Sequence, residues 1–217
     1  RVGIARALAV TPRVLLVDEP LAALDSKRKQ EILPYLERLH AELRIPVLYV
    51  SHTPDEVVRL ADHLVVLDCG RVRASGPLAE ILARLDFPIR LGDDAGAIIN
   101  GIVAELDPAW QLARVELDGG SVWIRDNGLP IGRRVRMRVL ARDVSLAEEP
   151  GVSSIQNVMR GRVEGLGDDE HPGLTLVRVR VGNSVVLAQL TRRAAADLGV
   201  AEGLDLWVQV KSVALME

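Results

Sequence analysis

Two carboxylates, Asp18 and Glu19, follow directly after the apolar run VLLV at residues 14–17. Four apolar residues in a row, β-branched at both ends, predict a strand that is buried on both faces of a parallel sheet. Open α/β sheets hold their ligands at the carboxyl ends of such strands. Paired acids there suit a site in which one carboxylate holds Mg²⁺ and the other orients or deprotonates a water. The alternative is an ordinary strand that ends in a solvated acidic turn.

A histidine follows the next predicted strand in a similar position. Residues 45–50 (IPVLYV) predict a second buried strand, and Ser51 and His52 come directly after it. Neighbouring parallel strands end at the same edge of a sheet, so His52 and the two acids are expected in one crevice. An imidazole there can hydrogen-bond a phosphate oxygen or an attacking water. A helix-capping or core histidine is the alternative.

The elements that must position these residues alternate between helices and strands. A helix is expected over residues 1–10, and Ser26 is expected to be the N-cap of a long helix that reaches about Leu43. Further along, the pattern predicts a helix over 54–61, a strand over 63–68, a hairpin arm over 71–74 and a helix over 77–85. This alternation predicts an α/β layer architecture with a parallel sheet.

Residues 1–85 resemble the nucleotide-binding subunit of an ABC transporter, a P-loop NTPase. The matching stretches are RVGIARAL before the first strand, LLVDEP as Walker B, LAALD as the D-loop and LYVSH as the switch-histidine segment. The resemblance implies that Asp18 holds Mg²⁺ through water and that Glu19 is the catalytic base. It also implies that His52 lies near the γ-phosphate of ATP and that Asp25 lies at the contact between two such subunits.

Other parts of the ABC pattern do not occur in the sequence. It contains no G-x-x-x-x-G-K-[ST], no LSGGQ-type signature and no Q-loop. In the ABC family, ATP is held between the phosphate loop of one subunit and the signature of the other. We therefore expect that this polypeptide alone does not hydrolyse ATP. Because it begins in mid-pattern and without Met, it looks like the C-terminal part of a longer protein.

Composition narrows the class of protein further. The 217 residues are 48% hydrophobic and 26% charged, with a formal net charge of −3 and only 3% aromatics. A chain with no basic stripe and so few aromatics is a poor candidate for nucleic-acid binding. Cys69 is the only cysteine, which excludes an intramolecular disulfide and fits a reducing compartment. No apolar run approaches the roughly 20 residues of a membrane-spanning helix.

The second half of the chain changes to short alternating runs typical of strands. Residues 88–99 are interpreted as a linker, because they carry Gly and Asp without a strong period. Two copies of a small β unit then follow, over residues 100–149 and 150–217. We expect a pair of OB-like barrels, with an added short helix that begins after Thr191 as N-cap.

The second β unit carries the donors that a tetrahedral oxyanion needs. These are hydroxyls, amides and one ammonium, with backbone N–H groups at the start of the short helix. The candidate residues are Ser154, Gln156, Asn157, Thr191, Lys211 and Ser212. The alternative is that they are ordinary turn and surface residues.

Residues 152–217 resemble a molbindin-type (TOBE) molybdate-binding domain, through SSIQNVMRGRV, LTRRAAADLGV and VQVKSVAL. Residues 100–149 look like a degenerate partner copy. The resemblance implies that the six candidates line an oxyanion site between subunits. Gln156 stands where the family pattern usually has Arg, and losing a guanidinium removes a charge and a bidentate donor set. Weak affinity or a vestigial site is therefore expected.

An ABC-type α/β part over residues 1–87, followed by TOBE-type barrels, is the layout of the ATP-binding subunit of molybdate importers. It implies a full-length parent that hydrolyses ATP with Mg²⁺ as a homodimer, with molybdate as a regulatory ligand. The expected partners are transmembrane permease subunits and, indirectly, a periplasmic or extracellular molybdate-binding protein, but no nucleic acid. The expected location is cytoplasmic, on the inner face of the cell membrane. The alternatives are an importer ATPase for sulfate, sugar, polyamine or iron, or a molybdate-binding or storage protein without transport.

Overall fold

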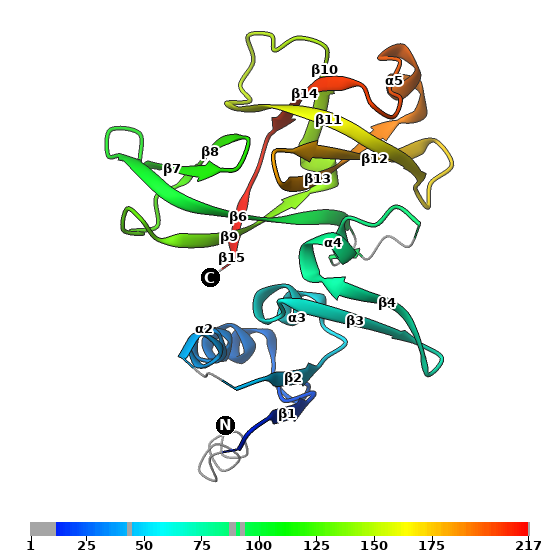
Figure 1. Cartoon of the computed structure of the whole chain (residues 1–217). Coiled ribbons are helices and arrows are strands. Elements are labelled where there is room, and N and C mark those ends of the chain that lie inside the picture. The colour runs from blue at the N-terminus through cyan, green and yellow to red at the C-terminus, as the bar shows by residue number, and fades with distance from the viewer. Residues whose placement is uncertain (1–11, 43–44, 87–89, 92–93, 217) are drawn as a thin grey trace. The chain divides into compact units, whose positions relative to one another are not determined.

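The computed structural model describes residues 12–42, 45–86, 90–91 and 94–216. The chain divides into two compact units, residues 1–64 together with 217, and residues 65–216. Figure 1 shows the elements of both. The helix expected over residues 1–10 lies outside the described residues. None of the described helices is long and apolar enough to cross a membrane.

In its described part, the first unit contains a parallel strand pair with two helices. Its elements are β1 (Leu15–Asp18), α2 (Ser26–Glu42), β2 (Val47–Val50) and α3 (Pro54–Leu60). Strands β1 and β2 pair in parallel, from Leu15 opposite Val47 to Asp18 opposite Val50. Helix α3 begins at Pro54 as predicted, and Leu60 at its end joins Ile32 of α2 in a small apolar core. The parallel pairing expected from the sequence is therefore confirmed for these two strands.

The expected burial of β1 on both faces is wrong for the part of the chain that the structure describes. Leu15 is 4% exposed, whereas its neighbour Leu16 is 65% exposed, and Leu48 on β2 is exposed as well. The sheet has two described strands, and its apolar core gathers on the face where α2 and α3 pack. Because successive side chains point to opposite faces, every second apolar residue is left outside this core.

Helix α2 starts where the sequence predicts, but its cap differs. The carboxylate of Asp25 accepts a hydrogen bond from the backbone N–H of Arg28 (2.9 Å), and the Asp25 carbonyl accepts from Lys29 N–H (2.9 Å). Asp25 is therefore the N-cap and Ser26 the first helical residue, so the cap lies one position earlier than expected. Pro34 lies inside this helix.

The third predicted strand does not join the first two in the described residues. Strand β3 (His63–Asp68) pairs with β4 (Arg71–Pro77) in a separate two-stranded sheet, and α4 (Leu78–Leu82) follows. Cys69 (φ 49°) and Gly70 (φ 74°) form the two-residue turn between them, both in the left-handed region. A two-residue turn reverses the chain and places β4 antiparallel beside β3. The described partner of β3 is therefore β4 and not β1 or β2.

The second unit consists mainly of two sheets that repeat one strand order. In the first sheet the order is β9-β6-β7-β8, and in the second it is β14-β11-β12-β13. The strands of the first are β6 (Asp94–Asp107), β7 (Leu112–Leu117), β8 (Gly120–Arg125) and β9 (Arg134–Leu140). Those of the second are β11 (Asn157–Asp168), β12 (Leu174–Val181), β13 (Ser184–Thr191) and β14 (Asp205–Val210). Each long first strand carries a bulge at an equivalent place, after Val103 and after Val163.

The two sheets exchange their last strands. Strand β10 (Val144–Ala147) follows β9 along the chain but pairs with β14 of the other sheet. In return, β15 (Ala214–Met216) follows β14 but pairs with β9. One apolar cluster contains buried residues of both sheets, among them Val115, Met137, Val179 and Val208. The two β copies are thus interlocked over a shared core.

Strand β6 begins at Asp94, inside the stretch 88–99 that was expected to be a linker. Gly96 to Ile99 pair with β9, and Ile98 and Ile99 are buried. A Cβ atom on Gly96 would lie 2.8 Å from the Val139 carbonyl oxygen. The glycine that suggested a loop therefore permits close approach of two strands, which is the other common role of glycine in a sheet. The short pair β5 (Arg90–Leu91) with β6 also lies in this stretch.

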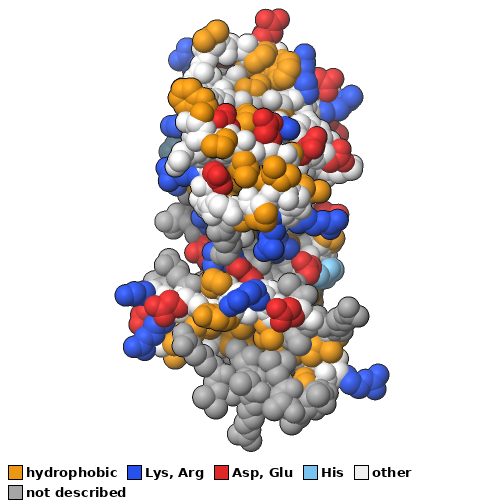
Figure 2. Space-filling view, turned by 90° about the vertical axis from the view of Figure 1, so that its left-hand side faces the viewer, with side chains coloured by type: hydrophobic (Ala, Val, Ile, Leu, Met, Phe, Trp, Pro, Cys, Tyr) orange, Lys and Arg blue, Asp and Glu red, His pale blue; other side chains and the backbone are white. Residues whose placement is uncertain are grey.

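One face of the second unit mixes both signs of charge (Figure 2). On the face shown in Figure 2, its Lys and Arg side chains lie among Asp and Glu side chains and exposed apolar groups. Short helix α5 (Arg192–Asp197) completes the unit, and the Thr191 hydroxyl accepts a hydrogen bond from Ala194 N–H (3.1 Å), as predicted for its N-cap.

Candidate functional site

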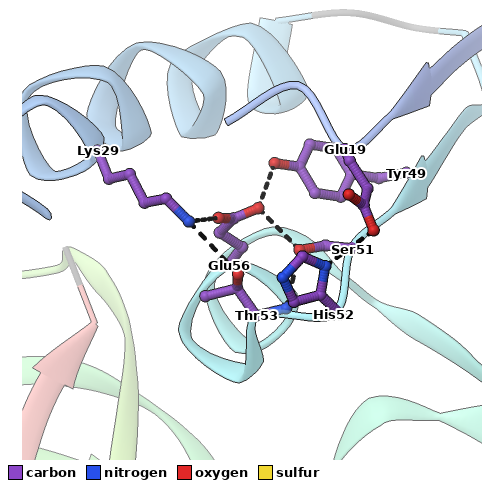
Figure 3. Close-up of polar contacts among 7 residues, drawn as sticks. All are labelled: Glu19, Lys29, Tyr49, Ser51, His52, Thr53 and Glu56. Atoms are coloured by element: carbon purple, nitrogen blue, oxygen red, sulfur yellow. Dashed lines mark hydrogen bonds and ion pairs between the residues drawn. The ribbon is translucent and has the colours of Figure 1, made fainter. Parts of the chain in front are cut away.

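The parallel register of β1 and β2 brings Glu19 and His52 together. Asp18 lies opposite Val50, and the Glu19 N–H donates to the Val50 carbonyl at 2.9 Å. Both strands end at this edge of the sheet, and Glu19 Oε1 lies 2.8 Å from His52 Nδ1. Figure 3 shows the imidazole and the carboxylate facing one another. Two residues that are 33 positions apart thus form one polar pair at the carboxyl ends of the strands.

The backbone of Glu19 is held in an unusual conformation. Its φ is +41°, in the left-handed region that non-glycine residues rarely adopt and that costs on the order of 1–3 kcal/mol. Backbone hydrogen bonds on both sides maintain it, from Glu19 N–H to Val50 and from Ala22 N–H to the Glu19 carbonyl. The Glu19 and His52 side chains remain 46% and 73% exposed, so both are open to a ligand.

The other two acids that the sequence singled out in the first unit, Asp18 and Asp25, have different surroundings. Asp18 is exposed at the end of β1, next to Glu19. Asp25 caps α2 and lies 3.4 Å from the guanidinium of Arg28. Within the described residues no three His, Cys, Asp or Glu side chains gather as a metal-binding group. Two neighbouring carboxylates nevertheless fit Mg²⁺, which commonly binds through one or two carboxylates and takes its remaining oxygens from water and phosphate.

A buried carboxylate beside this pair was not predicted from the sequence. Glu56, in the first turn of α3, is 2% exposed. It accepts hydrogen bonds from Lys29 Nζ (2.9 Å), Tyr49 OH (2.9 Å) and Ser51 Oγ (2.8 Å), as Figure 3 shows. A usable signal was its spacing of four residues from Leu60, which places both on the core-facing side of α3.

Electrostatics of the Glu56 cluster favour the charged carboxylate. Burial raises the pKa of Glu56, but the hydrogen bonds from Lys29, Ser51 and Tyr49 outweigh it and leave the pKa below its ordinary value. Burial, and then the hydrogen bond to the Glu56 carboxylate, raise the pKa of Tyr49 above its ordinary value. Glu56 is therefore an anion at neutral pH, paired with the ammonium of Lys29.

The oxyanion candidates of the second unit fall into two groups. Ser154, Gln156, Lys211 and Ser212 are exposed near the start of β11 and the end of β14, where Asn157 lies opposite Val210. Thr191 lies near the opposite end of β11. Asp168 at that end pairs with Thr175 of β12. The residue before Thr175, Leu174, pairs with Thr191 of β13. A single chain therefore does not bring all six residues to one place.

Asn157 has a structural task in this arrangement. It is buried, its Oδ1 accepts from the backbone N–H of Trp123 (2.7 Å), and its Nδ2 donates to the Trp123 carbonyl (3.2 Å). Trp123 belongs to β8, at the end of the first sheet's strand order, so this side chain joins the two sheets. The amide oxygen and one amide hydrogen are thus engaged within the chain.

Comparison with known proteins supports the two resemblances. Residues 153–216 match the TOBE domain family. The whole chain is 67% identical to the molybdenum import ATP-binding protein ModC of Methylococcus capsulatus, covering 61% of that protein. It is 60% and 58% identical to the proteins of the same name from Thiobacillus denitrificans and Aromatoleum aromaticum, covering 60% and 57% of them.

The chain thus spans about 60% of the length of the curated relatives that it matches. Among solved structures, the cytoplasmic molybdate-binding protein ModG with molybdate bound aligns with a TM-score of 0.46 and 20% identity, over 54% of this chain and 93% of that one. The resemblance predicted from the Walker B, switch-histidine and TOBE motifs is confirmed: over its whole length the chain is similar to molybdenum import ATP-binding proteins.

Proposed function

We propose that this chain is part of the ATP-hydrolysing subunit of an ABC-type molybdate importer. The observation that carries the proposal is the Glu19–His52 pair at the ends of two parallel strands, next to Asp18. The similarity of the whole chain to molybdenum import ATP-binding proteins supports the same conclusion. ATP would be the substrate, with Mg²⁺ as its metal partner.

Asp18, Glu19 and His52 each have a separate task in hydrolysis. Asp18 would hold Mg²⁺ through water, and the metal would neutralise charge on the phosphates. Glu19 orients the attacking water and accepts its proton on a carboxylate oxygen. His52 Nδ1 is occupied by Glu19, so Nε2 is the ring nitrogen left to contact a γ-phosphate oxygen, and it donates there when protonated. Positioning and charge, rather than covalent chemistry, carry such a reaction.

The test is Glu19→Gln in the full-length subunit assembled with its permease. Removing the general base lowers kcat for phosphate release by about 10²–10⁴-fold, while ATP binding is retained. Glu42→Gln, at the end of α2, makes the same chemical change away from the pair and leaves kcat unchanged. Hydrolysis that survives in Glu19→Gln at the wild-type rate contradicts the assigned base.

The assembly implied by this function has several parts. Two copies of the subunit would form a homodimer through the region of Asp25, on the cytoplasmic side of transmembrane permease subunits. A molybdate-binding protein outside the membrane would contact the permease and not this subunit. The importer role stated in the names of the relatives supports the permease as a partner. The homodimer and the outer molybdate-binding protein rest on the ABC resemblance alone.

The second unit would act as a regulatory oxyanion sensor with molybdate as its ligand. The separation of Thr191 from the group around Lys211 favours a site completed by a second chain, with one group from each copy. Calorimetric titration with molybdate, tungstate and sulfate, on a sample of measured oligomeric state, tests this. Binding of the first two over sulfate in a dimer supports the sensor, whereas a dimer that binds none makes this unit a dimerisation module.

A further inference from the structure

We propose that Glu56 is a positioning residue, which fixes the loop Ser51–Thr53 to the first turns of α2 and thereby holds His52 at Glu19. This inference rests on the proposed function, because it assigns the support of the same site. Within the described residues, Glu56 makes no hydrogen bond to Glu19 or to His52. It would therefore act on the site through the residues that it binds.

Three separate segments converge on the one carboxylate of Glu56. Its Oε1 accepts from Lys29 of α2, and its Oε2 accepts from Tyr49 of β2 and from Ser51 in the loop after β2. The side chain is 3% exposed, so these partners replace the water that a carboxylate otherwise requires. Figure 3 shows the carboxylate between the lysine on one side and the two hydroxyls on the other.

Both neighbours of His52 belong to this network. Ser51 Oγ donates to Glu56 and also accepts from the Thr53 N–H at 3.1 Å. The Thr53 hydroxyl accepts from Lys29 Nζ at 3.4 Å. The His52 ring itself is largely exposed, so packing does not hold it in place. The position of the ring at Glu19 therefore depends on the residues before and after it, which the network anchors.

The network also reaches the start of α2. Lys29 donates its backbone N–H to the carbonyl of Asp25, the residue placed at the subunit contact by the ABC resemblance. A continuous path of hydrogen bonds thus leads from Asp25 through Lys29 and Glu56 to Ser51, next to His52.

A purely structural role for Glu56 predicts a different outcome. In that case any ion pair between α2 and α3 would be equivalent, and the chain offers one for comparison. Arg59 of α3 lies 3.6 Å from the carboxylate of Glu37 in α2, away from the Ser51–Thr53 loop. Removing one partner of a buried ion pair is in general destabilising, so the folding of each variant is measured separately from its kcat.

The experiment compares Glu56→Gln with Glu37→Gln in the full-length subunit on its permease. We expect Glu56→Gln to lower kcat by about 100-fold, with KM for ATP within twofold, because displacing a reacting group by about 1 Å costs that much. Ser51→Ala should lower kcat in the same sense, and Lys29→Arg should retain most of the kcat that Lys29→Met loses. Glu37→Gln should leave kcat unchanged.

A folded Glu56→Gln variant with wild-type kcat, or an equal loss of kcat in Glu37→Gln, overturns the proposal. If Glu56→Gln does not fold, Ser51→Ala decides by the same criterion. If the wild-type assembly does not hydrolyse ATP, the proposed function fails, and amide hydrogen exchange of Thr53 in this chain then tests the positioning role alone. Exchange at Thr53 should accelerate about tenfold in Glu56→Gln and stay unchanged in Glu37→Gln; equal rates in both overturn it.

Discussion

At the scale of single residues, several positions are determined by contacts that are remote in sequence. Glu19 adopts a left-handed backbone because β2 and the following turn hold it, and this conformation directs its carboxylate to His52. Gly119 and Gly182, in the turns of two different hairpins, approach so closely that each occupies the space a Cβ of the other would need. The nearby Asn183 amide donates to Asp118 across the same contact.

Replacing Gly182 by Ala tests this contact. Gly182 has φ +56°, and an added Cβ would overlap the Asp118 carbonyl, so we expect the left-handed backbone cost of about 1–2 kcal/mol plus about 1–3 kcal/mol for the overlap. Gly199 has nearly the same φ, +58°, but open space around it, so Gly199→Ala should show only the first part. Urea unfolding of both variants measures the difference, and equal losses would contradict a close contact between the turns.

At the scale of elements, the first unit is joined by polar as well as apolar contacts. Ile32 and Leu33 of helix α2 share an apolar cluster with Leu60 of α3 and Tyr49 of β2. Lys29 of the same helix reaches the buried Glu56. The same helix is capped by Asp25 and contacts the loop that contains His52, through the hydrogen bond from Lys29 to Thr53. A buried carboxylate that remains charged makes this arrangement sensitive to acid.

The pH dependence of stability follows from the lowered pKa of Glu56. A carboxyl group whose folded pKa lies below its unfolded value, 4.5, contributes stability that is fully present above pH 4.5. That contribution is lost as the pH falls below 4.5 and through the folded pKa. The unfolding free energy of the wild type should therefore fall more steeply below pH 4.5 than that of Glu56→Gln, as measured by urea unfolding at a series of pH values. Parallel curves for the two proteins would show that Glu56 is not shifted.

At the scale of the whole molecule, the exchange of β10 and β15 makes the two β copies one folding unit. Each copy completes the sheet of the other, and Val115 and Val179 belong to one buried cluster. Neither copy can keep its sheet complete if the other unfolds. This interlocking is a property of the second unit as a whole and not of either repeat.

Thermal unfolding tests the interlocking. We expect residues 94–216 to unfold in a single cooperative transition, with calorimetric and van't Hoff enthalpies that agree. Removing Ala214–Met216, which lie at the end of the second copy, should lower the Tm of the first copy as well, because β9 loses its partner. Trp123 and Trp207 report on the two sheets, so two separate fluorescence transitions would contradict a shared core.

The extent of prediction from sequence differs between local and long-range features. The helix at Ser26, the helix at Pro54 and the Thr191 cap were predictable because caps, prolines and periodicity act over a few residues. The burial of Leu16 and the start of β6 were predicted wrongly, because both depend on which elements pack on a strand. The spacing of Glu56 from Leu60 marks the core-facing side of α3, but it does not reveal the three partners that allow a charge to be buried there. Glu56 was missed because those partners come from elsewhere in the fold.

The sequence alone determined which residues could do chemistry, and in what order they occur. Asp18, Glu19 and His52 each stand after a strand, and the Walker B and TOBE motifs are contiguous strings that need no structure to be recognised. Only the tertiary structure decided which residues meet. The parallel register set Glu19 against His52, Asn157 turned inward to the backbone of β8, and Thr191 came to lie away from Lys211. The physical reason is that strand pairing and packing join residues that are distant in the chain. Whether such contacts form depends on the free energy of the whole fold and not on the local sequence.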